Sequence, residues 1–478
     1  MSAGAAPSPP APWLTRTAPW FAPLSVGVAI LAALSLVDEP VGIGFTLALV
    51  VIYAAAAVAT GRRAGFAAVC WWGAALLAGI ATLRSAGWLV ALCLLASLAL
   101  AAIAATEART WRGLLFTSFE STLSGILGLG VIAGLLGRER RERTGKAGPV
   151  VRGLLIAAAL VLVFGSLFVA GDAVFAKTVA DLTGWLPAVD ETLPVRIFTA
   201  AVFLALAGAL ARLATATVEH TPDPNPRAGR LGRIEWTIAL GALDALFAVF
   251  VVLQAMVVLR GHEYVVQTAG MTYAEYVHQG FAAQMVAAAL TLTVIAAAWH
   301  LARRDSPAED RLLRTLLGGL CGLTLAVLAF CVWRIDLYVE AYGATQLRIL
   351  VVVIAIWLAT VFIALIVAGI RRSASWLPRA VVLSTGAILL GLALVNPDAW
   401  IADRNIDRYQ RTGKIDLPYL EGLSDDAVPV LATRLADNPS LNLAQHEADL
   451  QPPEGLVGFN IGRERARAAL DAQPPPNP

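Results

Sequence analysis

The sequence has few charged residues for its length. Of its 478 residues, 15% are Asp, Glu, Lys or Arg, whereas 58% are hydrophobic and the mean hydropathy is +0.70. A soluble domain is about a quarter charged and about half apolar. Because one globular core cannot hide this much apolar surface, the sequence predicts an all-α polytopic membrane protein.

Residues that commonly build chemical sites are also scarce. The four cysteines lie inside apolar runs and lack the spacing of a zinc site or a disulfide framework. The chain has no nucleophile elbow, no metalloprotease motif, no phosphate-binding loop and no dinucleotide fingerprint after a strand. No basic block indicates nucleic acid. We therefore expect no cofactor, no catalytic residue set and no nucleic-acid partner.

Twelve apolar runs are long enough to span a membrane, which takes about 20 residues because lipid offers the backbone no hydrogen-bond partner. The run at 113–136 is the weakest, since Thr117, Glu120 and Ser124 belong to a polar stripe at helical spacing. We expect it to be interfacial or re-entrant. That leaves about eleven transmembrane helices, at roughly 20–37, 41–60, 64–83, 88–105, 153–171, 197–217, 235–259, 281–301, 313–333, 349–370 and 379–395.

The positive-inside rule supports eleven spans. With a cytoplasmic N-terminus, the cytoplasmic segments of the first 395 residues hold 22 Lys and Arg and the outer segments hold six. Twelve spans would instead put the Arg-rich stretch 138–146 opposite Arg109 and Arg112. The tail from Asn396 has 8 basic and 13 acidic residues and is predicted to be extracytoplasmic. Since only three of the 36 basic residues are lysines, the composition favours a bacterial source and hence a bacterial plasma membrane.

These patterns predict five regions. They are a four-helix membrane region at 1–112, an interfacial segment with a basic cytoplasmic loop at 113–149, a seven-helix membrane domain at 150–395, a small extracytoplasmic helical cap at 396–470 and a disordered tail at 471–478.

Several stretches resemble a known family. They are LFAVFVVLQ at 246–254, MTYAEYVHQGF at 271–281, LYVEAYGATQLR at 337–348, NPDAWIADRNIDR and IDLPYLEGLSDDAVPVL in the tail, and FNIGRERARAAL at 459–470. From about Val150 to Leu470 the chain resembles the bacterial integral membrane family named domain of unknown function 4173 and, more distantly, domain of unknown function 4153. This resemblance implies a membrane protein and no activity. It also implies a basic residue at His278 and a neutral amide at Asp244 in relatives.

Asp244 is the first candidate functional residue. It lies nine residues after Glu235, about 14 Å along a helix and near the bilayer middle. A charge there costs at least about 2.5–3.5 kcal/mol, so the side chain should face the helix bundle. Two interpretations remain open: a proton or ion relay shared with Gln254, Gln284 or Glu120, and a neutral structural aspartate bonded to a Ser or Thr of a neighbouring helix.

Charged residues after the span at 313–333 form a second candidate group. Asp336 and Glu340 share a helical face, where like charges repel unless a cation bridges them. We expect a structural clamp, with binding of an anionic headgroup or substrate as the alternative. The group consists of Arg334, Asp336, Glu340 and Arg348.

Glu275 and His278 are one helical turn apart and could share a metal ion. A second such pair is absent from the sequence, so a solvated helix face is the better interpretation and we expect no metal.

Three classes of function fit the sequence. A non-enzymatic envelope scaffold, sensor or assembly factor would use the outer loops and tail to contact membrane lipids and other envelope proteins. A permease would use Asp244. A membrane enzyme acting on a lipid-linked substrate would use outer residues such as Asp398, Asp403 and Arg404.

The predicted orientation can be tested by cysteine labelling. A cysteine introduced after Pro429 should react with a membrane-impermeant reagent in intact cells, because the eleven-span topology puts the tail outside. Labelling that requires permeabilised cells would contradict this topology.

Overall fold

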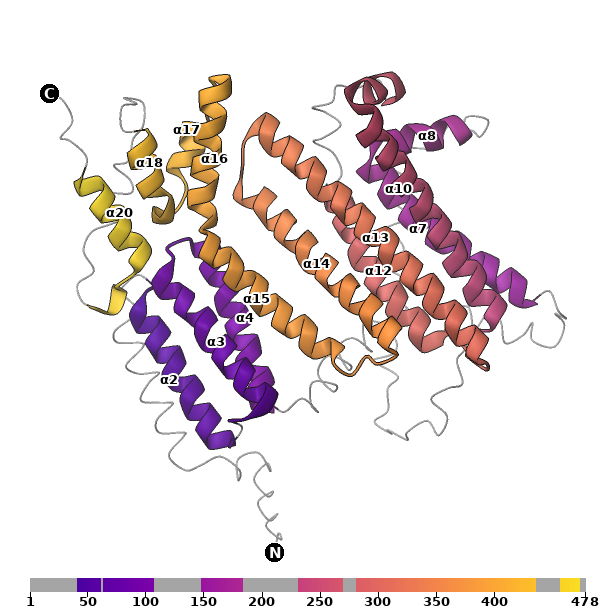
Figure 1. Ribbon diagram of the computed structural model, residues 1–478, viewed down its shortest axis with the longest axis horizontal. Helices are drawn as coiled ribbons and strands as arrows, with labels where there is room; N and C mark the ends of the chain where they lie inside the picture. The colour runs from indigo at the N-terminus through magenta and orange to yellow at the C-terminus, as the bar shows by residue number, and fades with distance from the viewer. Residues whose placement is uncertain are drawn as a thin grey trace, which may run out of the picture. The chain divides into compact units, whose positions relative to one another are not determined.

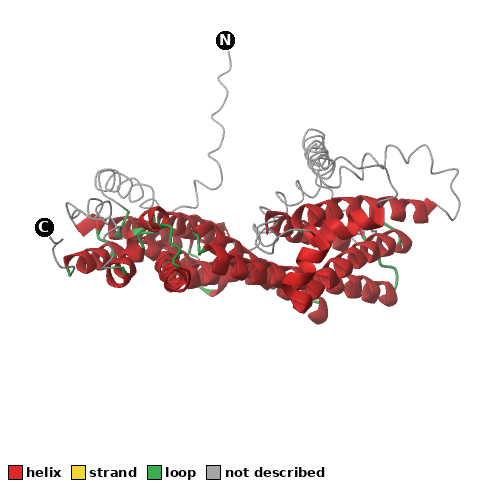
Figure 2. Ribbon diagram, turned by 90° about the horizontal axis from the view of Figure 1, so that it is seen from above, coloured by secondary structure: helices red, strands yellow, loops and turns green. Residues whose placement is uncertain are grey.

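A computed structural model describes residues 41–61, 63–106, 148–183, 231–269, 281–435 and 456–472. Every regular element within these ranges is a helix, as Figure 2 shows. An isolated β-bridge joins Leu231 to Ala302. The all-α prediction is therefore confirmed for the described part of the chain.

The chain divides into two compact units that interleave along the sequence. Unit 1 takes in Met1–Arg112, Gly343–Ile349 and Val382–Pro478, and unit 2 takes in Gly113–Tyr342 and Leu350–Val381. Unit 1 thus draws on segments from both ends of the chain and on a short turn from its middle.

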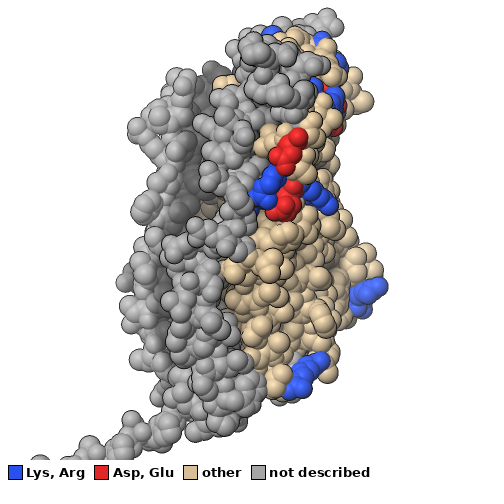
Figure 3. Space-filling view, turned by 90° about the vertical axis from the view of Figure 1, so that its left-hand side faces the viewer, with Lys and Arg blue, Asp and Glu red and all other residues tan. Residues whose placement is uncertain are grey.

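The described part of unit 1 contains three apolar helices that pack on one another, most of α15 (Leu377–Val395) and a group of short helices (Figure 1). The apolar helices α2 (Ile43–Thr60), α3 (Gly65–Leu83) and α4 (Gly87–Thr106) pack on one another. On the flank of this unit in Figure 3, a surface without Lys, Arg, Asp or Glu separates charged side chains at its upper and lower ends, as expected for a surface in contact with lipid.

The short helices follow α15, which belongs to unit 1 from Val382 onward. We call residues 396–435 and 456–472 the cap. Asn396 starts α16 because its side chain accepts a hydrogen bond from the backbone N–H of Ala399. The other cap elements are α17 (Leu417–Glu421), η1 (Asp425–Ala427), α18 (Val428–Arg434), η2 (Leu456–Gly458) and α20 (Ile461–Asp471), and α16 is Pro397–Thr412.

Unit 2 is a bundle of long apolar helices. Helix α7 packs on α10 and α12, and α13 packs on the same two helices. Helix α14 begins in unit 1 and runs on into unit 2, where Ala355, Leu358 and Phe362 join the core. The helices are α7 (Gly148–Gly171), α8 (Ala173–Thr183), α10 (Arg233–Ala269), α12 (Phe281–Leu301), α13 (Pro307–Tyr342) and α14 (Gln346–Arg371).

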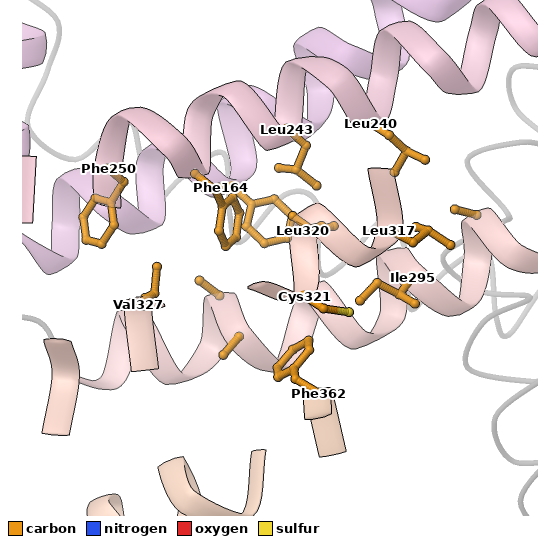
Figure 4. Close-up of a cluster of buried hydrophobic side chains, with 14 of the residues drawn as sticks. Phe164, Leu240, Leu243, Phe250, Ile295, Leu317, Leu320, Cys321, Val327 and Phe362 are labelled. Atoms are coloured by element: carbon orange, nitrogen blue, oxygen red, sulfur yellow. The ribbon is translucent and has the colours of Figure 1, made fainter. Parts of the chain in front are cut away.

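The core of unit 2 consists of apolar side chains that point into the space between these helices (Figure 4). Phenylalanines dominate one part of it: the Phe168 and Phe250 rings stack at 4.1 Å, and Phe247 meets Phe168 edge-on at 4.9 Å. Such pairs add about 0.5–1.5 kcal/mol beyond the burial of their area. They join α7 to α10.

Seven described helices are long and apolar enough to cross a membrane: α3, α7, α10 from Arg233 to Leu259, α12, α13, α14 and α15. Two shorter apolar stretches lie in α2 and α4. The expected spans at 20–37 and 197–217 and the segment 113–136 lie outside the described residues. The count of about eleven is therefore not confirmed, whereas the polytopic architecture is.

Polar residues mark both ends of the unit 2 helices. They are separated by 19 or 20 positions: Arg152 in α7 and Asp172 directly after it, Glu235 and Gln254 in α10, and Arg314 and Arg334 in α13. At 1.5 Å per residue this is about 28–30 Å, the thickness of the hydrocarbon core of a bilayer. At one end Arg152 pairs with Glu235 at 3.1 Å, and the opposite end carries the site described below.

Candidate functional site

A buried ion pair lies where the apolar part of the unit 2 helices ends. The Asp172 carboxylate accepts hydrogen bonds from Arg334 Nη1 at 3.2 Å and from Gln254 Nε2 at 2.6 Å. All three side chains are at most 1% exposed. We call Asp172, Gln254, Arg334 and Gln284 the polar layer. Its ion pair joins α13 to the end of α7, and Gln254 adds α10.

Local structure places Asp172 at this point. Helix α7 ends at Gly171, and Asp172 caps the next helix, α8, by accepting a hydrogen bond from the Phe175 backbone N–H at 2.8 Å. Arg334 Nη1 also donates to the Gly171 carbonyl at 3.4 Å. One carboxylate therefore caps a helix, neutralises a buried guanidinium and accepts from an amide.

Gln284 completes the polar layer from α12. Phe281, at the start of this helix, lies with its ring 5.6 Å from the Arg334 guanidinium carbon. Gln284 follows three residues later, on the same helical face as Phe281, and is fully buried. Both polar atoms of its amide lack a hydrogen-bond partner among the described residues. Of the predicted polar candidates, Gln254 thus binds the ion pair, and Gln284 lies one helical turn from Phe281, which contacts Arg334.

Asp244 faces α13 in the middle of the bundle. Its Oδ2 atom would be 3.6 Å from a Cβ atom placed on Gly319. Its Oδ1 atom is buried and has no hydrogen-bond partner in the part of the chain that the structure describes. The side chain is inward-facing as expected, but the Ser or Thr partner of the structural interpretation is not found for Oδ1.

Within α13, Arg334 lies apart from the other charged residues of the predicted group at 334–348. Arg334 is fully buried in the polar layer, whereas Asp336 and Glu340 are exposed on another face of α13. Arg348 belongs to unit 1, where its guanidinium donates to the Gly343 carbonyl. The physical reason is helical geometry, since positions 334 and 336 are about 200° apart around α13.

A second polar site lies in unit 1, beneath the cap. Asp398 is fully buried. Its Oδ1 atom accepts from Trp88 Nε1 at 3.2 Å and from Gln346 Nε2 at 3.1 Å. Its Oδ2 atom accepts from the Ser424 hydroxyl at 2.6 Å and from the Ser424 backbone N–H at 3.2 Å. Asp398 therefore joins α4, the start of α14 and two cap segments.

Asp426 attaches η1 of the cap to the end of α3. Its Oδ2 atom accepts from the backbone N–H groups of Ser85 and Ala86 at 2.7 and 3.0 Å, and Arg84 lies 3.8 Å from Oδ1. Gly462 of α20 packs so closely that a Cβ atom there would lie 2.4 Å from Oδ1. Burial raises the pKa of Asp426, the hydrogen bonds from Ala86 and Ser85 and the Arg84 charge lower it, and the raising effect is the larger.

The turn between α13 and α14 is bound to the cap as well. Gly343 has a φ of +88°, which favours glycine, and it lies against Asn405. Asn405 accepts from the Ala344 backbone N–H at 2.7 Å and donates to the Ala344 carbonyl at 2.9 Å. The Tyr419 hydroxyl accepts from the Gln346 backbone N–H at 2.9 Å. These hydrogen bonds pack the turn against the cap.

Asn460 provides a further connection, because its side-chain amide donates to the carbonyls of Ala81 and Arg84 at 2.9 and 2.8 Å. On the outer side of the cap, Arg434 binds Asp403 and Asp407 of α16.

The remaining predicted residues lie elsewhere. Glu120, Glu275 and His278 are outside the described residues. Within the described ranges, no group of three or more His, Cys, Asp or Glu side chains could hold a metal ion.

Sequence reasoning missed Asp172, Asp426 and Asn460. A usable signal existed for Asp172, which interrupts an apolar stretch twenty residues after Arg152, the distance that separates the two edges of a bilayer core. Asp426 and Asn460 stand among other polar residues of the tail, where nothing in the sequence distinguishes a buried group from a solvated one.

Comparison with known proteins identifies the family. The model of a family described as Domain of unknown function (DUF4153) matches residues 71–433, and the chain belongs to this family. The matched residues run from α3 to α18 and include both polar sites. The nearer resemblance, to domain of unknown function 4173, stays a prediction. No curated protein and no solved structure matches the chain.

The raised pKa of Asp426 predicts how stability depends on pH. Since the folded state holds this proton more tightly than the unfolded state, stability from this group falls as pH rises from about 3.9 through the folded pKa and is level above it. Acidification from about pH 7 to about pH 4 should therefore raise the melting temperature of the wild type relative to that of Asp426→Asn. Asp403→Asn, at a half-exposed site, is the control. If the melting temperature of the wild type stays level or falls relative to that of Asp426→Asn on acidification, the assignment is contradicted.

Proposed function

We propose that this member of the family is a non-enzymatic membrane scaffold, which presents its cap to other envelope proteins at the outer face of a bacterial plasma membrane. The observation that carries the proposal is the attachment of the cap. Two buried carboxylates, Asp398 and Asp426, use their oxygens to bind the cap to the ends of apolar helices. The cap is thus held as a fixed surface.

The chemistry of these carboxylates favours a structural role over catalysis. A general acid or base must have an oxygen within hydrogen-bond reach of a substrate. Both oxygens of Asp398 already accept from protein donors on three sides, and the side chain is fully buried. Asp403, another candidate for an enzyme, is bound to Arg434.

The outward surface of the cap supplies the groups that a partner would contact. Arg411, Lys414 and Asp416 are exposed at and after the end of α16. The segregation of 22 basic residues from six supports an extracytoplasmic position for this surface.

Site-specific photocrosslinking in cells tests the scaffold function. A photoreactive residue at Arg411 should form a discrete protein adduct, and the adduct should disappear in Asp398→Ala, which removes the acceptor that anchors the cap. The control position is Ser373, which is exposed at the other end of α14 and should form no such adduct. If the photoreactive residue gives only nonspecific crosslinking at Arg411, as at Ser373, the proposal is contradicted.

A second candidate, a proton-coupled permease, has one observation in its favour. Asp244 lies between α10 and α13 about 14 Å from the Glu235 end, and a buried oxygen of its carboxyl has no partner within the described ranges. A carboxyl at such a depth must be protonated, paired or hydrated.

Proteoliposomes test this candidate. If the protein is a proton-coupled permease, the wild type moves protons down an imposed pH gradient and Asp244→Asn loses this proton flux. The variant should keep its melting temperature, because the asparagine amide has the same shape as the carboxyl group. Asp181→Asn, at an exposed site of α8, is the control and should keep the flux. Equal fluxes in wild type and Asp244→Asn would eliminate the candidate.

A further inference from the structure

In the polar layer of unit 2, the amide of Gln284 has hydrogen-bonding groups that no described residue uses. Asp172 is fully engaged: Oδ1 accepts from Phe175, and Oδ2 accepts from Gln254 and Arg334. Gln284, in contrast, is 0% exposed, and both its Oε1 and Nε2 atoms lack a partner among the described residues. Burying an amide without hydrogen bonds costs free energy, because the amide loses its hydrogen bonds to water. We therefore expect another group to bind it inside the bundle.

Gln284 lies one helical turn after a residue that contacts the ion pair. The buried face of α12 consists of Gln284, Ala287, Ala288, Thr291, Ile295 and Ala298, at helical spacing. This helix packs on α7 and α13, which carry Asp172 and Arg334 at their ends. Phe281, one turn before Gln284, contacts the Arg334 guanidinium.

We propose that Gln284 and the Asp172–Arg334 pair form a binding site for a small uncharged ligand that both donates and accepts hydrogen bonds, namely water or a hydroxyl- or amide-bearing solute. The geometry of a carboxamide requires both properties, since Oε1 needs a donor and Nε2 needs an acceptor. A bare cation would leave Nε2 unsatisfied, and a simple anion would leave Oε1 unsatisfied.

Charge balance also favours an uncharged ligand. Arg334 and Asp172 neutralise each other at 3.2 Å, so the layer has no excess charge to offset that of an ion. The site also lies at one edge of the hydrocarbon core. Arg334, Asp172 and Gln254 lie about 28–30 Å along their helices from the charged opposite end, so a ligand enters without crossing the hydrocarbon core.

The melting temperature of Gln284→Met in lipid nanodiscs tests the proposal. Methionine keeps the unbranched shape of glutamine and removes its hydrogen bonds. If a ligand occupies the site, the melting temperature should fall by about 2–4 °C, because the hydrogen bonds to that ligand are lost. If nothing is bound, replacing an unsatisfied amide by an apolar side chain should raise the melting temperature or leave it unchanged, and either outcome would overturn the proposal.

Two controls calibrate this measurement. Thr291→Val changes a fully buried polar residue on the same face of α12, whose hydroxyl is satisfied by the Ala287 carbonyl at 2.9 Å, and should shift the melting temperature less than Gln284→Met. Gln254→Met removes a donor to Asp172 and should lower the melting temperature, which shows that the assay detects a lost hydrogen bond in this layer.

A direct observation and a solute titration complete the test. A high-resolution map should show density within about 3.5 Å of the Gln284 amide. Absence of such density, in a map that resolves the waters of the protein surface, would also overturn the proposal. Addition of glycerol distinguishes a solute from water as the ligand. If glycerol raises the melting temperature of the wild type more than that of Gln284→Met, the ligand is a hydroxyl-bearing solute. If both melting temperatures rise equally and the map shows density at the amide, the ligand is water.

Discussion

The structure depends on the fact that a bilayer core, about 30 Å thick, offers no partner to a polar group. Three helices of unit 2 meet this constraint in the same way. Each has a charged or amide residue at both ends of an apolar stretch of about twenty residues. The side chains between these ends form the phenylalanine-rich core. Asp244 is the described exception, and this makes it the natural candidate for a function in the membrane.

The free-energy cost of burying an unpaired charge explains why buried charges in this protein have partners from several helices. Asp172 meets Arg334 of α13 and Gln254 of α10, and loss of one member of such a pair typically costs about 3–5 kcal/mol. Asp426 in unit 1 relies mainly on backbone N–H groups at the end of α3. In each case, the residue that neutralises or satisfies the carboxylate lies far away in the sequence.

Asp398 and Gln284 differ in how completely their polar atoms are satisfied, and this difference separates their roles. Around Asp398 every carboxylate oxygen has protein donors, so this site holds the cap and has no acceptor left for chemistry. The polar layer in unit 2 contains the Gln284 amide with unused donors and an unused acceptor. A fully satisfied network points to attachment, whereas an unsatisfied buried amide points to a ligand.

The sequence by itself determined the helical class, most of the positions of the described spans and the depth of Asp244, because apolar run length and rise per residue depend on the chain alone. It also indicated Gln254 and Gln284 as polar groups in apolar surroundings. Only the tertiary structure decided that Arg334 pairs with Asp172 rather than joining Asp336 and Glu340, and that Asp398 and Asp426 are buried. The reason is that partners such as Asp172 and Arg334, 162 residues apart, meet only when helices pack, and local sequence carries no record of which faces will meet.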